Sequence, residues 1–183
     1  MKQNMYVDCR VGNFGDDAVR LIALCDNQND QVVISKTLPY MPPSSPYKGK
    51  TAEQVAQIKE IQRNTVIAVD NKIIFAKWDL YFVETEHLDE AMQAYYLLDR
   101  TKCLILSDDV KQQCSPSNII EVRKMDVSGK KYELNSDELT NSNMGVLIVC
   151  WAVMRMRNAA ICVEEEVDAT QEDIDSFDVP FVI

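Results

Sequence analysis

Strand-like stretches of apolar residues occupy the first forty positions. Val, Ile and Leu are concentrated in residues 18–25 and 31–38, and the polar run 26–30 separates them. Residues 5–11 alternate loosely between apolar and polar and end at the turn signal Gly12–Gly15. Aliphatic runs bounded by Asn, Asp and Gly are typical of strands joined by turns. We therefore predict a strand at 5–11 and a hairpin formed by 18–25 and 31–38.

The next segment carries a loop signal and then a helix signal. Residues 39–46 hold four of the six prolines, so we predict an exposed loop there. Thr51 with Gln54 three residues later is a capping-box signature, and apolar residues follow at helical spacing from Val55. The pattern predicts a helix over 52–63.

Residues 65–69 and 72–83 are predicted as two strands joined at Asp70–Asn71. In the second strand, alternation places Ile74, Ala76, Trp78, Leu80 and Phe82 on a core face. The other face carries Phe75, Lys77 and Tyr81, an aromatic and basic surface that could stack on a flat ligand. The alternative interpretation is a face half-covered by a neighbouring element.

The second half of the chain alternates between helix and strand patterns. We predict a helix at 86–100, a short buried strand at 103–106, a hairpin formed by 119–125 and 131–134, and a helix that carries the apolar run 144–154. The predicted fold is an α+β domain over residues 1–162, with an antiparallel sheet and about three helices.

The hairpin around Asp126–Gly129 carries the densest basic cluster of the chain. Its residues are Arg123, Lys124, Lys130, Lys131 and Tyr132. Such a cluster could contact phosphates, and together with Phe75, Lys77 and Tyr81 it forms our candidate nucleic-acid-binding set. A solvated hairpin tip is the alternative.

The last segment, residues 163–183, has a different composition from the rest. It holds eight acidic residues and no Lys or Arg, and it ends in an apolar stretch interrupted only by Pro180. A segment of this kind cannot bury enough apolar surface to fold alone, but it offers a partner a negative strip and an apolar anchor. We predict that this acidic C-terminal tail docks a protein partner through Asp175, Phe177, Asp178, Val179, Pro180 and Phe181. A solvated terminus that aids solubility is the alternative.

Charge and cysteine usage narrow the class of protein. The net charge is −10, but without the tail the body has 21 acidic and 19 basic residues and is nearly neutral. The six cysteines form no CxxC pair and lie mostly in apolar runs, as buried thiols of a reducing compartment do. The N-terminus has no apolar signal region, and eleven apolar residues at 144–154 are too few to cross a bilayer. We expect a cytoplasmic protein, in the host cytoplasm if viral, with no membrane contact.

Catalytic signatures are scarce. The single histidine, His87, lies at the start of a predicted helix without a Cys or second His at metal-ligand spacing, and we interpret it as a surface or capping residue. No glycine-rich phosphate loop is present. The acidic pairs Asp16–Asp17 and Asp108–Asp109 resemble magnesium ligands but are common in loops. We therefore predict no enzymatic activity, no catalytic residue, no metal site and no cofactor.

Three short pieces, in order, resemble bacterial and phage single-stranded-DNA-binding proteins of the OB-fold type. Residues 11–20, VGNFGDDAVR, are similar to an early signature of that family, and residues 123–132, RKMDVSGKKY, to its basic hairpin. Residues 178–181, DVPF, are similar to its acidic C-terminal tip. Val182 and Ile183 follow the Phe on which that family ends, and Met125 stands where it has an aromatic residue.

This resemblance implies an OB-like sheet, single-stranded nucleic acid as a partner, and a tail that recruits proteins or competes with the DNA. The resulting hypothesis is a non-enzymatic binding protein for single-stranded DNA, able to form a homo-oligomer. The rival hypothesis is a viral assembly or virion component, or a phage-encoded inhibitor, whose acidic tail packs on a neighbouring protein.

Overall fold

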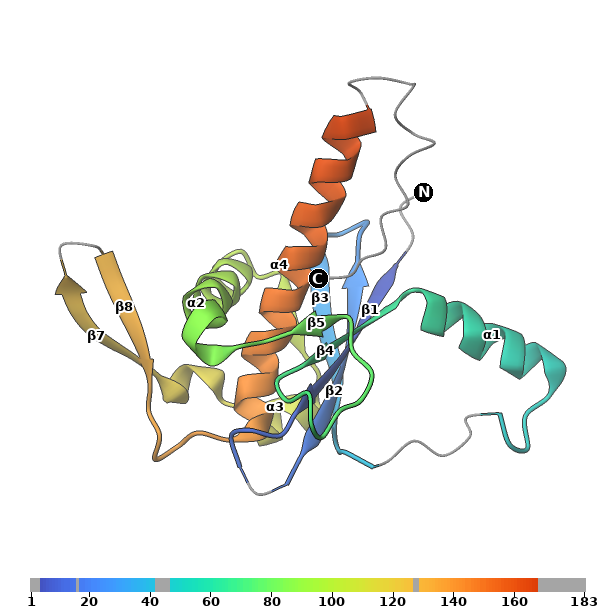
Figure 1. Cartoon of the computed structure of the whole chain (residues 1–183), viewed down its shortest axis with the longest axis horizontal. Helices are drawn as coiled ribbons and strands as arrows, with labels where there is room; N and C mark the ends of the chain where they lie inside the picture. Colours follow the sequence, from blue (N-terminus) through green and yellow to red (C-terminus); the bar gives the residue numbers. More distant parts are fainter. Residues whose placement is uncertain (1–3, 16, 42–46, 127–128, 168–183) are drawn as a thin grey trace.

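A six-stranded sheet backed by helices forms the body of the protein (Figure 1). The computed structural model describes residues 4–15, 17–41, 47–126 and 129–167, and of 121–132 and 160–167 only the backbone. In chain order the elements are β1 Met5–Val11, β2 Val19–Asp26, β3 Gln31–Pro39, α1 Ala52–Arg63, β4 Thr65–Val69, β5 Leu80–Tyr81, α2 Glu84–Arg100, β6 Leu104–Leu106, α3 Asp108–Gln113, the 3-10 turn η1 Pro116–Ile119, β7 Ile120–Asp126, β8 Gly129–Leu134 and α4 Asn141–Val167.

The sheet is open and mixed, with the strand order β5-β4-β1-β2-β3-β6. The meander β1–β2–β3 is antiparallel and confirms the predicted hairpin. β4 returns parallel to β1, β5 lies parallel to β4, and β6 lies parallel to β3. The prediction of an antiparallel sheet is therefore correct only for the first three strands, because the segments that contain α1 and α2 provide the long crossovers that parallel neighbours need. The sheet does not close into a barrel, so the OB-like expectation is not met.

Helix α4 covers one face of the sheet. It packs against β1 and β2, and its residues 144–153 are nearly all buried. The close approach requires Gly145, because a Cβ atom there would collide with the Leu21 side chain. The Cys9 thiol lies 3.8 Å from the Gly145 carbonyl oxygen across the same contact. The predicted apolar run is thus the central helix of the core.

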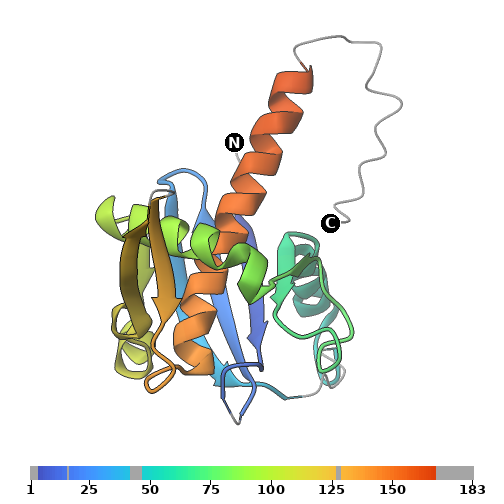
Figure 2. The same cartoon turned by 60° about the vertical axis from the view of Figure 1, so that its left-hand side comes forward.

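Helix α2 packs beside α4 and completes the covered side (Figure 2). Trp151 of α4 donates a hydrogen bond to Glu90 of α2 at 2.8 Å, and Arg155 donates two more to the same carboxylate oxygen. Burial acts to raise the pKa of Glu90, but these hydrogen bonds outweigh it and hold the pKa below its ordinary value. The ionised carboxylate therefore links the two helices.

Two predicted elements have a different form in the structure. Residues 72–83 are not a long strand: a loop runs from Asn71 to Asp79, and only Leu80–Tyr81 pairs with β4. The described residues also form four α-helices and not about three, because α3 was missed. Its six residues are too short to show helical periodicity, although Ser107 is a recognisable cap that accepts the Val110 N–H.

Helix α1 stands apart from α2 and α4 (Figures 1 and 2). Its capping box at Thr51 and Gln54 forms as predicted. None of its residues is buried, and Ile61 is 45% exposed. The predicted hairpin is also present as β7–β8, a separate two-stranded sheet.

Helix α4 extends to Val167, five residues into the segment that we assigned to the tail. Residues 168–183 lie outside the described part of the chain, so the partner-docking set Asp175 to Phe181 stays a prediction. Among the described helices, none is both long and apolar enough to cross a membrane.

Candidate functional site

The sheet face opposite α4 is only partly covered. Strand alternation places Cys9, Leu21 and Ala23 against α4, and the intervening residues therefore point to the other side. We call this side the open face and define it by three rows of paired positions. The rows are Tyr81, Val69, Arg10, Arg20 and Leu38; then Ile67, Asp8, Ile22 and Lys36; then Thr65, Tyr6, Leu24, Val33 and Ile105.

The middle of the open face holds a charged triad. The Asp8 carboxylate accepts hydrogen bonds from Arg20 at 2.8 and 3.0 Å and from Arg10 at 3.0 Å. Asp8 is 5% exposed, whereas the Arg20 side chain is 41% exposed. The buried carboxylate thus orients two arginines and leaves the group with one net positive charge, with Arg20 in contact with solvent.

Aromatic rings and cations lie together beyond the β5 edge. The Lys72 ammonium is 4.2 Å from the Tyr81 ring centroid and 4.9 Å from that of Trp78, and the two rings are 5.8 Å apart. Lys72 and Lys77 are exposed, and both rings are half-buried. Two of the three predicted residues of this region, Lys77 and Tyr81, therefore remain available at the surface.

Phe75 is a correction to the predicted aromatic surface. It is fully buried and meets Tyr40 edge-to-face at a centroid distance of 4.8 Å. A buried ring cannot stack on a base, so Phe75 has a packing role. The predicted core residues Ile74 and Ala76 are instead exposed, because the segment loops away from the sheet and alternation no longer applies.

The carboxyl ends of β1 and β4 hold a polar network centred on Asp70. Its carboxylate accepts the N–H groups of Gly12 and Asn13 at 2.9–3.1 Å, and Asn13 donates to the Asp70 carbonyl. Burial raises the pKa of Asp70, and the backbone hydrogen bonds oppose that rise. Asn141 extends the network by accepting the Phe14 N–H and donating to the Asp17 carbonyl.

Ligands of open α/β sheets commonly bind at the carboxyl ends of parallel strands, so this network was tested as a metal site. Asp70 directly follows Val69, which pairs with Arg10 on the open face, so strand alternation places Asp70 on the α4 side, whereas Asp8 lies on the open face. Each carboxylate is already satisfied by donors of the chain. Within the described residues, no three His, Cys, Asp or Glu side chains are grouped as metal ligands would be. The network serves to fix the loop after β1.

His87 hydrogen-bonds to the backbone at the start of α2, which fits the capping role, one of the two that the sequence left open. Its Nδ1 accepts the Val83 N–H at 2.9 Å, and its ring lies 4.9 Å from the Trp151 ring. Burial, and next the charge of Arg155, lowers its pKa. The neutral ring is the form that can accept this hydrogen bond.

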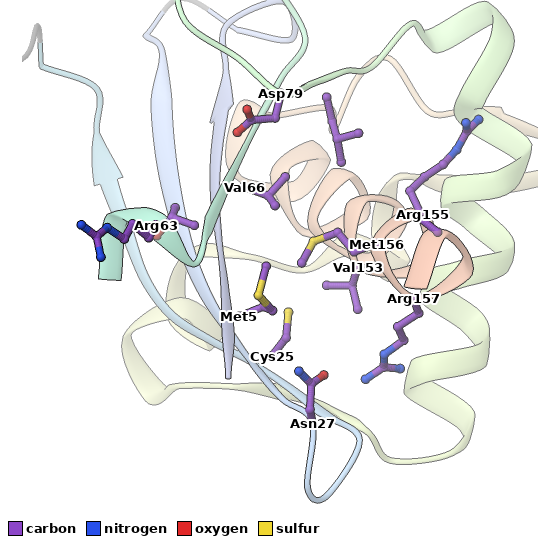
Figure 3. Close-up of a pocket in the computed structure, with 13 residues that line it drawn as sticks. Met5, Cys25, Asn27, Arg63, Val66, Asp79, Val153, Arg155, Met156 and Arg157 are labelled. Carbon is purple, nitrogen blue, oxygen red and sulfur yellow. The ribbon is translucent and has the colours of Figure 1, made fainter. Parts of the chain in front are cut away.

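A cavity of about 510 Å³ lies on the α4 side of the sheet (Figure 3). Met5, Cys25, Val66, Val153 and Met156 form much of its wall. Sequence patterns did not predict it, because its residues come from six elements spread over the chain.

The basic residues of the predicted hairpin lie in β7 and β8, where only the backbone is described. Lys130 pairs with Met125, Tyr132 pairs with Val122, and a register shift occurs at Arg123 and Lys124. The hairpin lies on the other side of α2 from α1 (Figure 1). The structure therefore does not place the hairpin beside Lys77 and Tyr81. The open-face residues Arg10, Arg20, Lys36 and Tyr6 were missed, although the alternation of β1 with β2 could have indicated them.

Comparison with known proteins gives little guidance. No family model and no curated protein matches this chain. A solved structure, the large terminase nuclease from thermophilic phage G20c, is similar over 80% of this chain and 81% of its own, with a TM-score of 0.45 and 11% sequence identity. The prediction that this chain is not an enzyme is contradicted by this neighbour, which is an enzyme, and is withdrawn. A similarity of this size does not assign the neighbour's activity to this chain.

Proposed function

We propose that this protein binds single-stranded nucleic acid on the open face of its sheet. The observation that carries the proposal is the combination of a partly covered sheet surface with cations and aromatic rings in adjacent rows. Single-strand binding needs both a positive track for phosphates and flat rings for bases.

The cations are placed to follow a backbone across the strands. Arg10 and Arg20 are fixed by Asp8 in the centre, exposed Lys36 lies in the neighbouring row on β3, and Lys72 lies beyond the β5 edge. Arg20 retains solvent access, so a phosphate can reach it without losing the Asp8 contact. Contacts of this kind give affinity that falls with salt, because binding releases counterions.

The rings lie on either side of these cations. Tyr81 occupies the same row as Arg10, and Trp78 lies next to it. Tyr40 lies under the Arg10 guanidinium at 5.8 Å from the ring centroid. Stacking on such rings contributes about 1–3 kcal/mol per base and tolerates any sequence. The basic hairpin residues Arg123, Lys124, Lys130, Lys131 and Tyr132 supply a second, separate contact in this proposal.

Charge reversal tests the open face. In the double variant Lys36→Glu with Lys72→Glu, affinity for a labelled oligothymidylate should fall about tenfold or more at low salt, and the salt slope should become shallower by roughly 0.7 for each lost phosphate contact. The measurement is fluorescence anisotropy over a salt series. Arg100→Glu with Lys111→Glu, an equal charge change at exposed positions of α2 and α3, is the matched control and should lower affinity much less.

Equal losses of affinity in the open-face double variant and in this control would refute an open-face site. No binding by the wild-type chain would refute the function as a whole. Unchanged melting temperatures of all variants are required for either conclusion.

A docking surface for another protein is the second candidate, favoured by apolar residues on the loops around the open face. Ile73 is 95% exposed and Met41 is 77% exposed. Exposed apolar side chains mark a protein-binding site where they form one contiguous patch. An assembly subunit should form defined oligomers without nucleic acid, and Ile73→Ser should dissociate them in sedimentation velocity. A monomer at all concentrations would oppose this candidate.

A further inference from the structure

The cavity on the α4 side has an apolar wall, and its border carries three arginines and one acid, Asp79, whose carboxylate accepts the Ile67 N–H. Met5, Cys25, Val66, Val153 and Met156 face it, and Arg63 and Arg157 lie on opposite sides of it (Figure 3). Its volume of about 510 Å³ falls in the range of sites that hold small ligands or the anchor residue of a peptide. Such a site suits an apolar group that is attached to negative charges.

Arg63 and Arg157, at the border of the cavity, are available to bind an anionic group. Arg155, which also borders the cavity, is neutralised by Glu90. Arg157 donates one hydrogen bond to the Asp30 carbonyl, an uncharged acceptor, at 3.0 Å. Across the part of the chain that the structure describes, no carboxylate forms an ion pair with Arg63 or Arg157. An acidic ligand would therefore find two unneutralised cations at this border.

The chain itself contains a segment with this chemistry, close to the cavity. Helix α4 both lines the cavity, from Val153 to Ala159, and leads into residues 168–183. These sixteen residues contain five acidic side chains and no basic one, and they end in Val179, Pro180, Phe181, Val182 and Ile183.

The segment is long enough to return to the cavity. Ala159, at the cavity, lies about 12 Å along the helix axis from Val167, the last residue of α4, because a helix rises 1.5 Å per residue. Phe181 follows Val167 by fourteen residues, which span up to about 46 Å when extended. A tether of this length keeps the segment at an effective concentration of order millimolar near the cavity.

We propose that the C-terminal segment folds back onto its own body, with the Phe181 side chain in the cavity and its acidic residues against Arg63 and Arg157. Phe181 is the anchor because Pro180 and Val182 flank it within the apolar stretch 179–183, whereas Phe177 is flanked by Ser176 and Asp178. This contact does not depend on nucleic-acid binding, because the cavity and the open face lie on opposite sides of the sheet.

The Cys25 thiol provides a direct readout, because it lines the cavity and is only 2% exposed. In the full chain, the rate of Cys25 alkylation by iodoacetamide is measured by mass spectrometry for the wild type and for Phe181→Ala. With a millimolar effective concentration and an intrinsic Kd near 0.1 mM, removal of the anchor should raise the rate about tenfold. Arg63→Gln should raise it less, and Arg100→Gln, at an exposed position of α2, should leave it unchanged. Arg157 is avoided because its charge also lowers the pKa of Cys25, which burial raises to about 11.

Cys114 and Cys150 are internal controls, since both are buried and neither lines the cavity. Their rates should not change, and a rise at all three thiols would indicate unfolding and overturn the assignment. A synthetic peptide of residues 168–183 should restore protection of Cys25 in the Phe181→Ala chain. An unchanged Cys25 rate in Phe181→Ala contradicts the proposal. If protection of Cys25 in the wild type were lost when the protein is diluted, the segment would bind the cavity of a second copy, which contradicts a contact within one chain.

Discussion

The two faces of the sheet are built from the same strands but differ in what covers them. On β2, Leu21 is fully buried under α4, while Leu24, three positions on, is only partly buried on the open face. The covered face fits tightly enough that Gly145 has no room for a side chain, whereas Arg20 and Lys36 on the open face retain access to solvent. The packing of the covered face therefore stabilises the fold, whereas the side chains of the open face are available to bind a ligand.

Replacing the same residue type on the two faces of one strand should give the largest contrast. Leu21→Ala should lower the free energy of unfolding by about 2–5 kcal/mol, because it leaves a cavity in a packed core. Leu24→Ala should cost less, about 1–2 kcal/mol, because a partly buried leucine has less buried area to lose. Urea denaturation of both variants measures the difference. Equal costs would show that the open face is packed as tightly as the covered one.

The fit of α4 against β2 is tested by Gly145→Ala. The added methyl group would collide with Leu21, and overpacking of this kind costs about 1–3 kcal/mol. The higher helix propensity of Ala, worth about 1 kcal/mol at an exposed site, offsets part of that cost. Thermal unfolding is the measurement, with Leu21→Ala combined with Gly145→Ala as the control. The double variant should be more stable than additivity predicts, since the smaller residue makes room for the methyl group. Strict additivity would contradict the contact.

The smallest expected effect is a loss of stability in mild acid through His87. Because its pKa is lower in the folded protein than the unfolded value of 6.5, the folded state binds the proton less well. Stability should therefore be complete above the unfolded pKa and fall as the pH drops through 6.5 toward the folded pKa. His87→Gln, which cannot titrate, should remove this part of the pH dependence in urea titrations. If the free energy of unfolding of the wild type and of His87→Gln changed with pH in the same way below 6.5, the hydrogen bond assigned to His87 would be contradicted.

The sequence predicted local structure well where local chemistry decides it. The capping box of α1, the β2–β3 hairpin and the buried run of α4 all depend on neighbouring residues, and all are present. The segment 72–83 misled the prediction because its alternating apolar residues mimic a strand. In the structure Phe75 packs on Tyr40, which is distant in sequence, and the loop is held by the Asn71 side chain, which accepts the N–H groups of Ile73 and Ile74.

The candidate site was less predictable, because it depends on strand pairing. Asp8 and Arg10 lie on β1, and Arg20 of β2 meets them only through the β1–β2 register. Tyr81 joins the row of Arg10 and Arg20 only through β4. The parallel return of β4 beside β1 follows a crossover whose path no local pattern specifies. The cavity likewise needs Cys25, Val66 and Met156 to meet across three elements.

Ultraviolet cross-linking of the full chain to a single-stranded oligonucleotide, with mass spectrometry of the adducts, tests the central claim most directly. The account predicts adducts at Tyr6, Tyr40, Trp78 or Tyr81, around the open face. Adducts confined to Tyr95 and Tyr96 of α2, on the covered side, would contradict it, as would the absence of any adduct.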